Sequence, residues 1–162
     1  MEVSSYDGAT IIKSHSKDVF GIAGSGVTLG CYIVGNNTIK AAPNNSLFQH
    51  EYGHYRQSQE FGWLYLPKCG IPSLFSKSPH NSHPVEQDAN IRGYEYFKNK
   101  TPNFKWDNSN KIYPNSKKLT WNGQDFITGL LTIGTLVFAP YLYPSIIVVP
   151  GLFNSLFYNY QY

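Results

Sequence analysis

The chain of 162 residues has few charged side chains for a soluble protein. Charged residues make up 14% of it, against roughly a quarter in an average soluble domain. Disordered chains combine many charges with few aromatic residues, whereas aromatic residues make up 16% of this sequence. The composition therefore argues against disorder. The length predicts one folded domain with a hydrophobic core, because it is short for two.

Cysteine is scarce and a secretion signal is lacking. The two cysteines, Cys31 and Cys69, are 38 positions apart and do not form a Cys-x-x-Cys pair. They could form one disulfide or remain two buried thiols, and the spacing does not decide between these states. The first residues contain neither a basic nor an apolar stretch, so we do not expect them to act as a signal peptide. We expect either a cytosolic protein or a domain whose export signal lies elsewhere in a longer chain.

A clear excess of positive charge occurs only in residues 92–118, which contain 7 Lys and Arg against 2 Asp and Glu. Asn, Ser and Pro lie between the basic residues, and no stacking platform or recognition helix accompanies them. The pattern predicts a solvated loop region. With a net charge of only +3, we expect no nucleic-acid partner.

The last part of the chain carries no charge after Asp125. Its longest unbroken apolar stretch, residues 126–139, would span about 21 Å as a helix, which is short of the roughly 30 Å hydrocarbon core of a membrane. We expect residues 126–162 to form an apolar helical segment that packs on a domain of residues 1–125. Contact of residues 126–157 with a membrane or a partner is the alternative.

Local patterns predict an α+β fold. Within residues 19–41, β-branched and apolar runs alternate with glycine and asparagine turns, which predicts a small antiparallel sheet. Asparagine, serine and proline dominate residues 99–118, which are expected to be irregular.

Two helices are expected after the sheet. The first covers residues 47–61, with Asn45 or Ser46 as its cap and Gly62 at its end. The second covers residues 84–98 and starts with a proline, which suits the first turn of a helix.

The first of these helices carries the sequence HEYGH at residues 50–54. His50 and His54 are four residues apart and share one helical face, so both imidazoles can bind one metal ion. Glu51 lies beside them and can take a proton from a water molecule. This is the logic of the HExxH pattern, which predicts a zinc site with Glu51 as the catalytic base.

A catalytic zinc ion needs a third protein ligand and an open position for water. We predict Glu86 as this ligand, because Asn90 lies one turn further on the same helix face and can hydrogen-bond a ligand imidazole. His83, Glu60 and Asp88 are the alternatives. His83 lies in a loop, Glu60 would be carried away by the continuing helix, and Asp88 would face another side of the second helix.

These residues resemble the gluzincin family, in which HExxH is followed by a second motif, Glu-x-x-Ala-Asp. The corresponding residues here run from Glu86 to Asn90, so an amide replaces the final carboxylate. A neutral amide raises the basicity of a ligand imidazole less than a carboxylate does, which would weaken metal affinity. The resemblance implies a zincin-like fold, in which the HExxH helix packs on a second, ligand-bearing helix.

A wider resemblance covers most of the chain. Residues 28–33, 43–55, 70–73 and 83–90 are similar to a domain at the C-terminal ends of rearrangement-hotspot (Rhs) repeat proteins of Bacteroidetes, and the apolar tail is also similar. Such domains usually act as toxins delivered to competitors. The resemblance implies a secreted effector domain, exported as part of a larger chain, with a cognate immunity protein as a partner.

The sequence thus predicts a zinc metallopeptidase that acts on a protein or peptide. In this hypothesis His50, His54 and Glu86 hold Zn²⁺, Glu51 is the base and Asn90 supports one imidazole. A second hypothesis is a membrane-active or partner-binding toxin domain with a structural metal site. A third is a processing or binding module, in which the metal centre cleaves only its parent chain or holds a partner.

Overall fold

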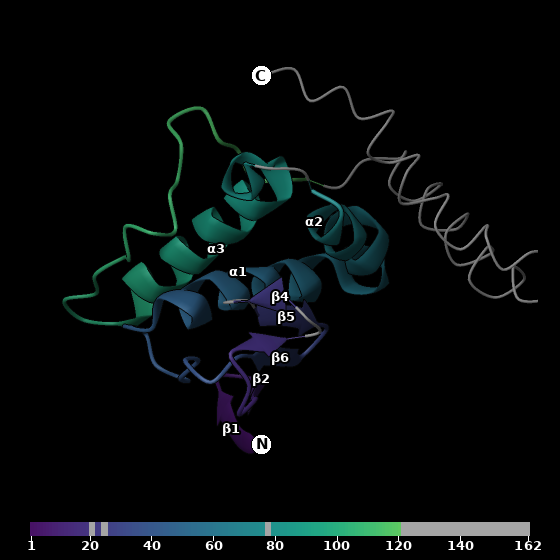
Figure 1. Cartoon of the computed structure of the whole chain (residues 1–162). Helices are drawn as coiled ribbons and strands as arrows, with labels where there is room; N and C mark the ends of the chain where they lie inside the picture. Colours follow the sequence, from purple (N-terminus) through teal and green to yellow (C-terminus); the bar gives the residue numbers. More distant parts are fainter. Residues whose placement is uncertain (20–21, 24–25, 77–78, 121–162) are drawn as a thin grey trace, which may run out of the picture.

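The computed structural model describes residues 1–19, 22–23, 26–76 and 79–120. The central element is the helix α1 (Ser46–Phe61), which packs against a β-sheet on one side and against the helix α3 (Pro84–Lys100) on the other (Figure 1). The expected α+β architecture is confirmed. The predicted apolar segment 126–162 lies outside the described residues.

The strands form a four-stranded sheet with the order β1-β2-β6-β5, and β3 pairs with β4 in a separate ribbon. Their bounds are β1 Glu2–Tyr6, β2 Ala9–Lys13, β3 Asp18–Val19, β4 Ile22–Ala23, β5 Gly26–Leu29 and β6 Tyr32–Gly35. The prediction of an antiparallel sheet is wrong in one pairing, because β2 and β6 run parallel, with Ile11 opposite Ile33. The two strands are neighbours although 18 residues separate them along the chain.

The sheet also begins earlier than predicted. Tyr6 pairs with Ala9 across a two-residue turn in which Asp7 and Gly8 have positive φ angles of 37° and 88°. Positive φ at both central positions defines a type I′ turn, for which Asp-Gly is a preferred sequence. The hairpin of β1 and β2 is therefore encoded in a local signal that the sequence analysis missed.

The sheet expected within residues 19–41 ends earlier, at Gly35, and residues 38–41 form no strand in the described structure. The side chain of Asn36 accepts hydrogen bonds from the backbone N–H and the hydroxyl of Thr38, at 2.9 and 2.6 Å. This local bonding turns the chain away from the sheet directly after β6.

Both predicted helices are confirmed. In α1 the side chain of Asn45 accepts a hydrogen bond from the Phe48 N–H, and Gly62 follows the last turn with a φ of 55°. In α3 the cap is His83, whose side chain accepts from the Val85 N–H. Short helical turns that the sequence did not predict connect α1 with α3: η1 Gly62–Leu64, η2 Leu66–Gly70, α2 Ile71–Leu74 and η3 His80–Ser82.

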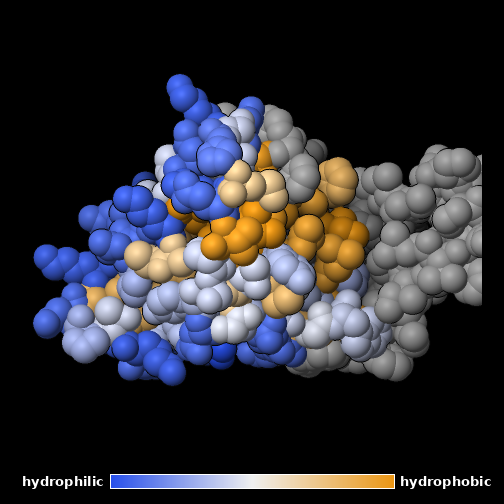
Figure 2. Space-filling model, turned by 90° about the horizontal axis from the view of Figure 1, so that it is seen from below, coloured by the Kyte–Doolittle hydropathy of each residue, from blue (hydrophilic) through white to orange (hydrophobic). Residues whose placement is uncertain are grey.

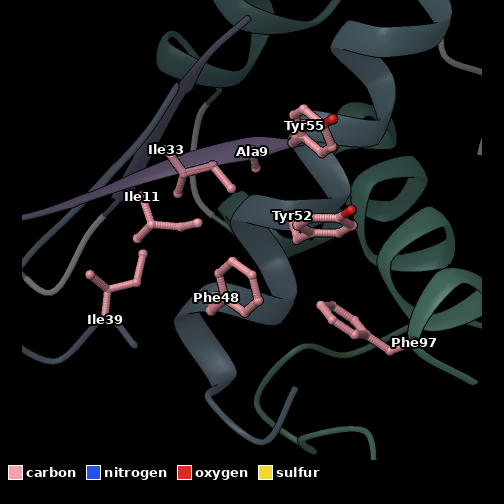
Figure 3. Packing of buried hydrophobic residues seen from close by; sticks show 8 residues of the cluster. All are labelled: Ala9, Ile11, Ile33, Ile39, Phe48, Tyr52, Tyr55 and Phe97. Carbon is pink, nitrogen blue, oxygen red and sulfur yellow. The ribbon is translucent and has the colours of Figure 1, made fainter. Parts of the chain in front are cut away.

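One hydrophobic cluster joins the sheet, α1 and α3 (Figure 3). Phe48, Tyr52 and Tyr55 project from one face of α1 towards Ile33 of β6 and Phe97 of α3. The ring centroids of Phe48 and Phe97 lie 5.8 Å apart, a separation typical of packed aromatic pairs. His50 follows Phe48 and His54 follows Tyr52 by two residues, about 200° around the helix, so packing of this face in the core directs both imidazoles to the other side of α1.

The two helices cross at unusually close range because small residues meet there. A Cβ atom built on Gly53 would lie 1.9 Å from the backbone oxygen of Ala89, and one on Gly93 would lie 2.6 Å from the backbone oxygen of Gln49. Any side chain at either glycine would force the helices apart. The close crossing brings the polar face of α3 within reach of the imidazoles of α1.

The basic region is irregular after Thr101, as predicted, but its expected solvation is wrong at Arg92. This side chain lies in α3, is 7% exposed and contacts both Asp88 and Glu60. Side-chain amides bind the backbone of residues 103–120 at several points. Gln87, for example, donates to the Lys111 oxygen and accepts from the Tyr113 N–H.

The two cysteines are free thiols in different surroundings: Cys31 is exposed and Cys69 is buried. The sequence left a disulfide and two buried thiols as alternatives, and the structure has neither, because only one of the two thiols is buried. Among the described residues, no helix combines the length and apolar character needed to cross a membrane. The face of the molecule shown in Figure 2 nevertheless carries a band of hydrophobic residues between hydrophilic ones.

Candidate metal centre

Side chains from α1 and α3 converge on one oxygen atom. His50 and His54 lie one turn apart on α1, with ring centroids 4.9 Å apart. Their Nε2 atoms lie 3.1 and 3.2 Å from Oε2 of Glu86, which comes from the first turn of α3. The ligand atoms of these three residues all lie within 4.8 Å of one another. The structure thus brings together the two histidines and the carboxylate that the sequence singled out.

The distances suit a metal ion. Zinc binds imidazole nitrogen and carboxylate oxygen at about 2.0–2.2 Å, so two ligand atoms of a tetrahedral site lie about 3.3 Å apart. The separations between each imidazole and Glu86 have this length within about 0.2 Å. These three residues can therefore hold a divalent cation with little movement.

Glu86 itself carries a second indication. Its side chain is fully buried, and Oε1 has no hydrogen-bond partner within the described part of the chain. A buried polar atom without a hydrogen-bond partner is costly, so native structures seldom retain one. A cation bound at this carboxylate would offset that cost, and the donor set of two imidazoles and one carboxylate fits zinc.

Electrostatics inside the cluster favour the charged carboxylate. Burial lowers the pKa of His50, but the hydrogen bond to Glu86 and its negative charge outweigh burial and raise the pKa to about 9. For Glu86, burial acts to raise the pKa, yet the charge of His54 and the hydrogen bonds from the surrounding imidazoles hold it well below its usual range. Glu86 therefore presents a full negative charge to any cation at the centre.

Each ligand imidazole is oriented by a buried amide. Nδ1 of His50 lies 2.8 Å from Oδ1 of Asn90, as the helical spacing predicted. Nδ1 of His54 lies 2.8 Å from Oε1 of Gln57, a partner that the sequence analysis missed. Because these oxygens can only accept, both Nδ1 atoms carry a proton, and Nε2, the nitrogen that faces Glu86, is the atom of each ring that a metal would bind in place of its proton.

The other end of each amide explains why an amide and not a carboxylate occupies the position. Nδ2 of Asn90 donates to the backbone oxygen of Lys111 at 3.1 Å. Nε2 of Gln57 donates to the Val85 oxygen at 2.8 Å and to the carboxylate of Asp88 at 2.7 Å. A carboxylate at either position would direct an acceptor at another acceptor. An amide at residue 90 therefore fits the local hydrogen bonds.

Glu51 lies next to the centre and is held by the edge strand β5. Its side chain is 4% exposed, and Oε2 accepts a hydrogen bond from the Thr28 hydroxyl at 2.8 Å. A Cβ atom on Gly26 would lie 2.7 Å from both Cγ and Oε1 of Glu51, so only glycine lets the carboxylate lie this close to the strand. The carboxylate is thus fixed in one orientation.

Glu51 and the metal-binding group open into one narrow cleft. The cleft has a volume of about 70 Å³ and lies between β5 on one side and η2, α2 and His80 on the other. Tyr65 lines it and donates from its hydroxyl to the Thr28 oxygen at 3.0 Å. The rim includes the exposed apolar side chains of Leu29, Leu66 and Leu74.

The three alternative ligands are engaged elsewhere. His83 caps α3 through its contact with the Val85 N–H. Asp88 and Glu60 both contact the guanidinium of Arg92. Neither belongs to the group of His50, His54 and Glu86 whose ligand atoms lie together.

A further histidine, which the sequence analysis did not consider, reaches the same carboxylate. Nε2 of His80, on η3, lies 3.3 Å from Oε2 of Glu86. No regular helix places His80, so spacing along the chain gave no signal for it. Gln57, by contrast, follows His54 by three residues on the same helix face, and this spacing could have identified it.

Comparison with known proteins assigns the chain to no family. The chain matches no family model, no curated protein and no solved structure. The interpretation of the centre therefore depends on its own geometry.

Proposed function

We propose that the chain is a zinc-dependent peptidase. The observation that carries the proposal is the convergence of His50 and His54 on Glu86 at 3.1 and 3.2 Å, with Glu51 in the same cleft. Zinc, when bound, would polarise the scissile carbonyl and bring the pKa of a water molecule towards neutrality.

Side chains of the protein carry out the other steps of the proposed reaction. Glu51 takes a proton from the attacking water and passes it to the leaving amine. Thr28 holds one oxygen of this carboxylate, which leaves the other oxygen to accept the proton. Asn90 and Gln57 keep both ligand imidazoles in the tautomer that offers Nε2 to the metal.

We further propose that this activity serves a toxin. The support is the resemblance of several segments to Rhs-associated C-terminal domains, together with an uncharged tail after Asp125. In this proposal the domain is exported as part of a larger chain, attacks proteins of a competitor and is neutralised by an immunity protein. Expression of the chain without that partner should inhibit bacterial growth.

The test is the isosteric substitution Glu51→Gln. The purified variant should retain about one zinc per chain, because Glu51 is not among the three ligands. Cleavage of a peptide library and inhibition of growth should both be lost, since the amide cannot take a proton.

The matched control is Glu95→Gln, the same change at an exposed carboxylate of α3 that contacts Lys118. This control should retain both zinc and activity. A Glu51→Gln protein that still cleaves peptides at the wild-type rate would refute the proposed mechanism, and a chain that takes up no zinc would refute the metal centre.

A further inference from the structure

His80 is the outermost member of the cluster around Glu86. Its imidazole lies in the cleft, and its side chain is 49% exposed, whereas the side chains of His50 and His54 are 17% and 6% exposed. It belongs to η3, a single turn directly before α3. A third imidazole therefore approaches the metal centre from the open side of the cleft.

The distance from His80 to Glu86 equals an edge of a zinc tetrahedron. Nε2 of His80 lies 3.3 Å from Oε2 of Glu86, and adjacent ligand atoms of tetrahedral zinc lie about 3.3 Å apart. His50 and His54 stand at 3.1 and 3.2 Å from the same oxygen. The ligand atoms of His50, His54 and Glu86 all lie within 4.8 Å of one another, and His80 is outside this group, so its imidazole must move inward to reach the same ion. Three imidazoles and one carboxylate would then complete a four-coordinate ion and leave no position for water.

The support of His80 differs from that of the other two imidazoles. Asn90 and Gln57 are buried amides that fix His50 and His54. Nδ1 of His80 instead contacts the hydroxyl of Ser76, and this pair lies at the surface. An imidazole held by an exposed hydroxyl group is easier to displace than one held in the core, because fewer contacts are lost when it moves.

We propose that His80 is a displaceable fourth ligand of the metal. Bound, it fills the position that water must take for hydrolysis and keeps the centre closed. A substrate or small anion that enters the cleft takes its place. The inference rests on the proposed function, because it requires a metal ion held by His50, His54 and Glu86.

The test uses the full chain loaded with Co²⁺, whose visible spectrum reports the number and type of ligands. The His80→Ala protein should show a changed spectrum, and X-ray absorption should count one imidazole fewer than the three in the wild type. If His80 occupies the metal in about nine-tenths of the wild-type molecules, azide finds an open site in about one-tenth of them, and its apparent affinity is about tenfold lower. Azide should therefore bind about tenfold more tightly to His80→Ala.

Two further variants separate ligation from folding. His80→Gln keeps a polar side chain of similar length and should behave like His80→Ala. His83→Asn removes the neighbouring histidine but keeps a cap for α3, and it should match the wild type in spectrum and azide affinity. Unchanged thermal unfolding of the metal-free variants would show that the turn is intact.

Each outcome bears on one claim. Identical Co²⁺ spectra and azide affinities for the wild type and His80→Ala would overturn the role of His80 and leave the proposed peptidase standing. A wild-type centre that excludes azide even at saturation would show that His80 is a permanent ligand, which overturns displacement. A chain that takes up neither Co²⁺ nor Zn²⁺ would remove the proposed function itself.

Discussion

Replacement of Gly53 by alanine tests whether the close helix crossing builds the metal centre. The added Cβ atom would lie 1.9 Å from the backbone oxygen of Ala89, whereas real Cβ contacts stay above 3.0 Å. The helices must therefore separate by at least 1.1 Å, the difference between these two distances. Because the obstacle is backbone and not the end of a flexible side chain, α3 has to move as a unit.

The magnitude follows from two opposing effects. Glycine to alanine inside a helix gains about 1 kcal/mol from helix propensity. Overpacking of a close-packed interface costs about 1–3 kcal/mol. Because a rigid backbone must move, we expect an overpacking cost in the upper part of this range. After the gain in helix propensity is subtracted, the free energy of unfolding should fall by about 1–2 kcal/mol. Glu86 precedes Ala89 by one turn and would shift by a similar distance, which exceeds the roughly 0.2 Å tolerance of a metal site.

Chemical denaturation of the metal-free protein measures the first effect, and competition with a chelator measures the second. Zinc affinity of Gly53→Ala should fall at least about tenfold. The exposed helix position Gln59→Ala is the control and should change neither quantity. If Gly53→Ala is more stable than the wild type and binds zinc equally well, then the crossing does not determine the geometry of the centre.

Three further predictions concern single contacts. Gln57→Ala removes the acceptor for the His54 Nδ1 proton and should weaken zinc binding by about 10–100-fold; an unchanged affinity in a chelator competition would contradict the role of this amide. Thr28→Val removes the hydroxyl that holds Glu51. It should leave the zinc content unchanged, while kcat on a peptide substrate should fall about tenfold. An unaltered kcat would show that the hydroxyl is dispensable. Burial, followed by the charge of Asp88, raises the pKa of the Cys69 thiol well above its ordinary value. Little thiolate then forms even at mildly alkaline pH, so iodoacetamide should modify Cys31 alone in the folded protein and both cysteines after denaturation, and mass spectrometry of the labelled chain decides this.

The helices and the ligands were predictable because their signals are local. Asn45 and Gly62 mark the two ends of α1 in the sequence, and the structure has both at these ends. Helical spacing alone places His50 beside His54 and Glu86 beside Asn90. Once the two helices pack, these pairs face each other, so most of the candidate centre follows from periodicity.

The rest depends on contacts between distant parts of the chain. The parallel pairing of β2 with β6 leaves no trace in local spacing, because it is set by how the connection folds back. His80 reaches the centre from the short turn η3, which no regular helical spacing relates to α1. The hairpin at Asp7 and Gly8 is a different case, since its turn signal was present and was overlooked.

The amides behind His50 and His54 have one more consequence, for the response of the centre to acid. A carboxylate in the place of Asn90 or Gln57 would gain a proton in acid and would then no longer accept the hydrogen bond from Nδ1 of the neighbouring imidazole. An amide keeps the same donors and acceptors in acid and in alkali. Acid therefore leaves the direct partners of both imidazoles unchanged, and it reaches the centre through other, ionisable side chains.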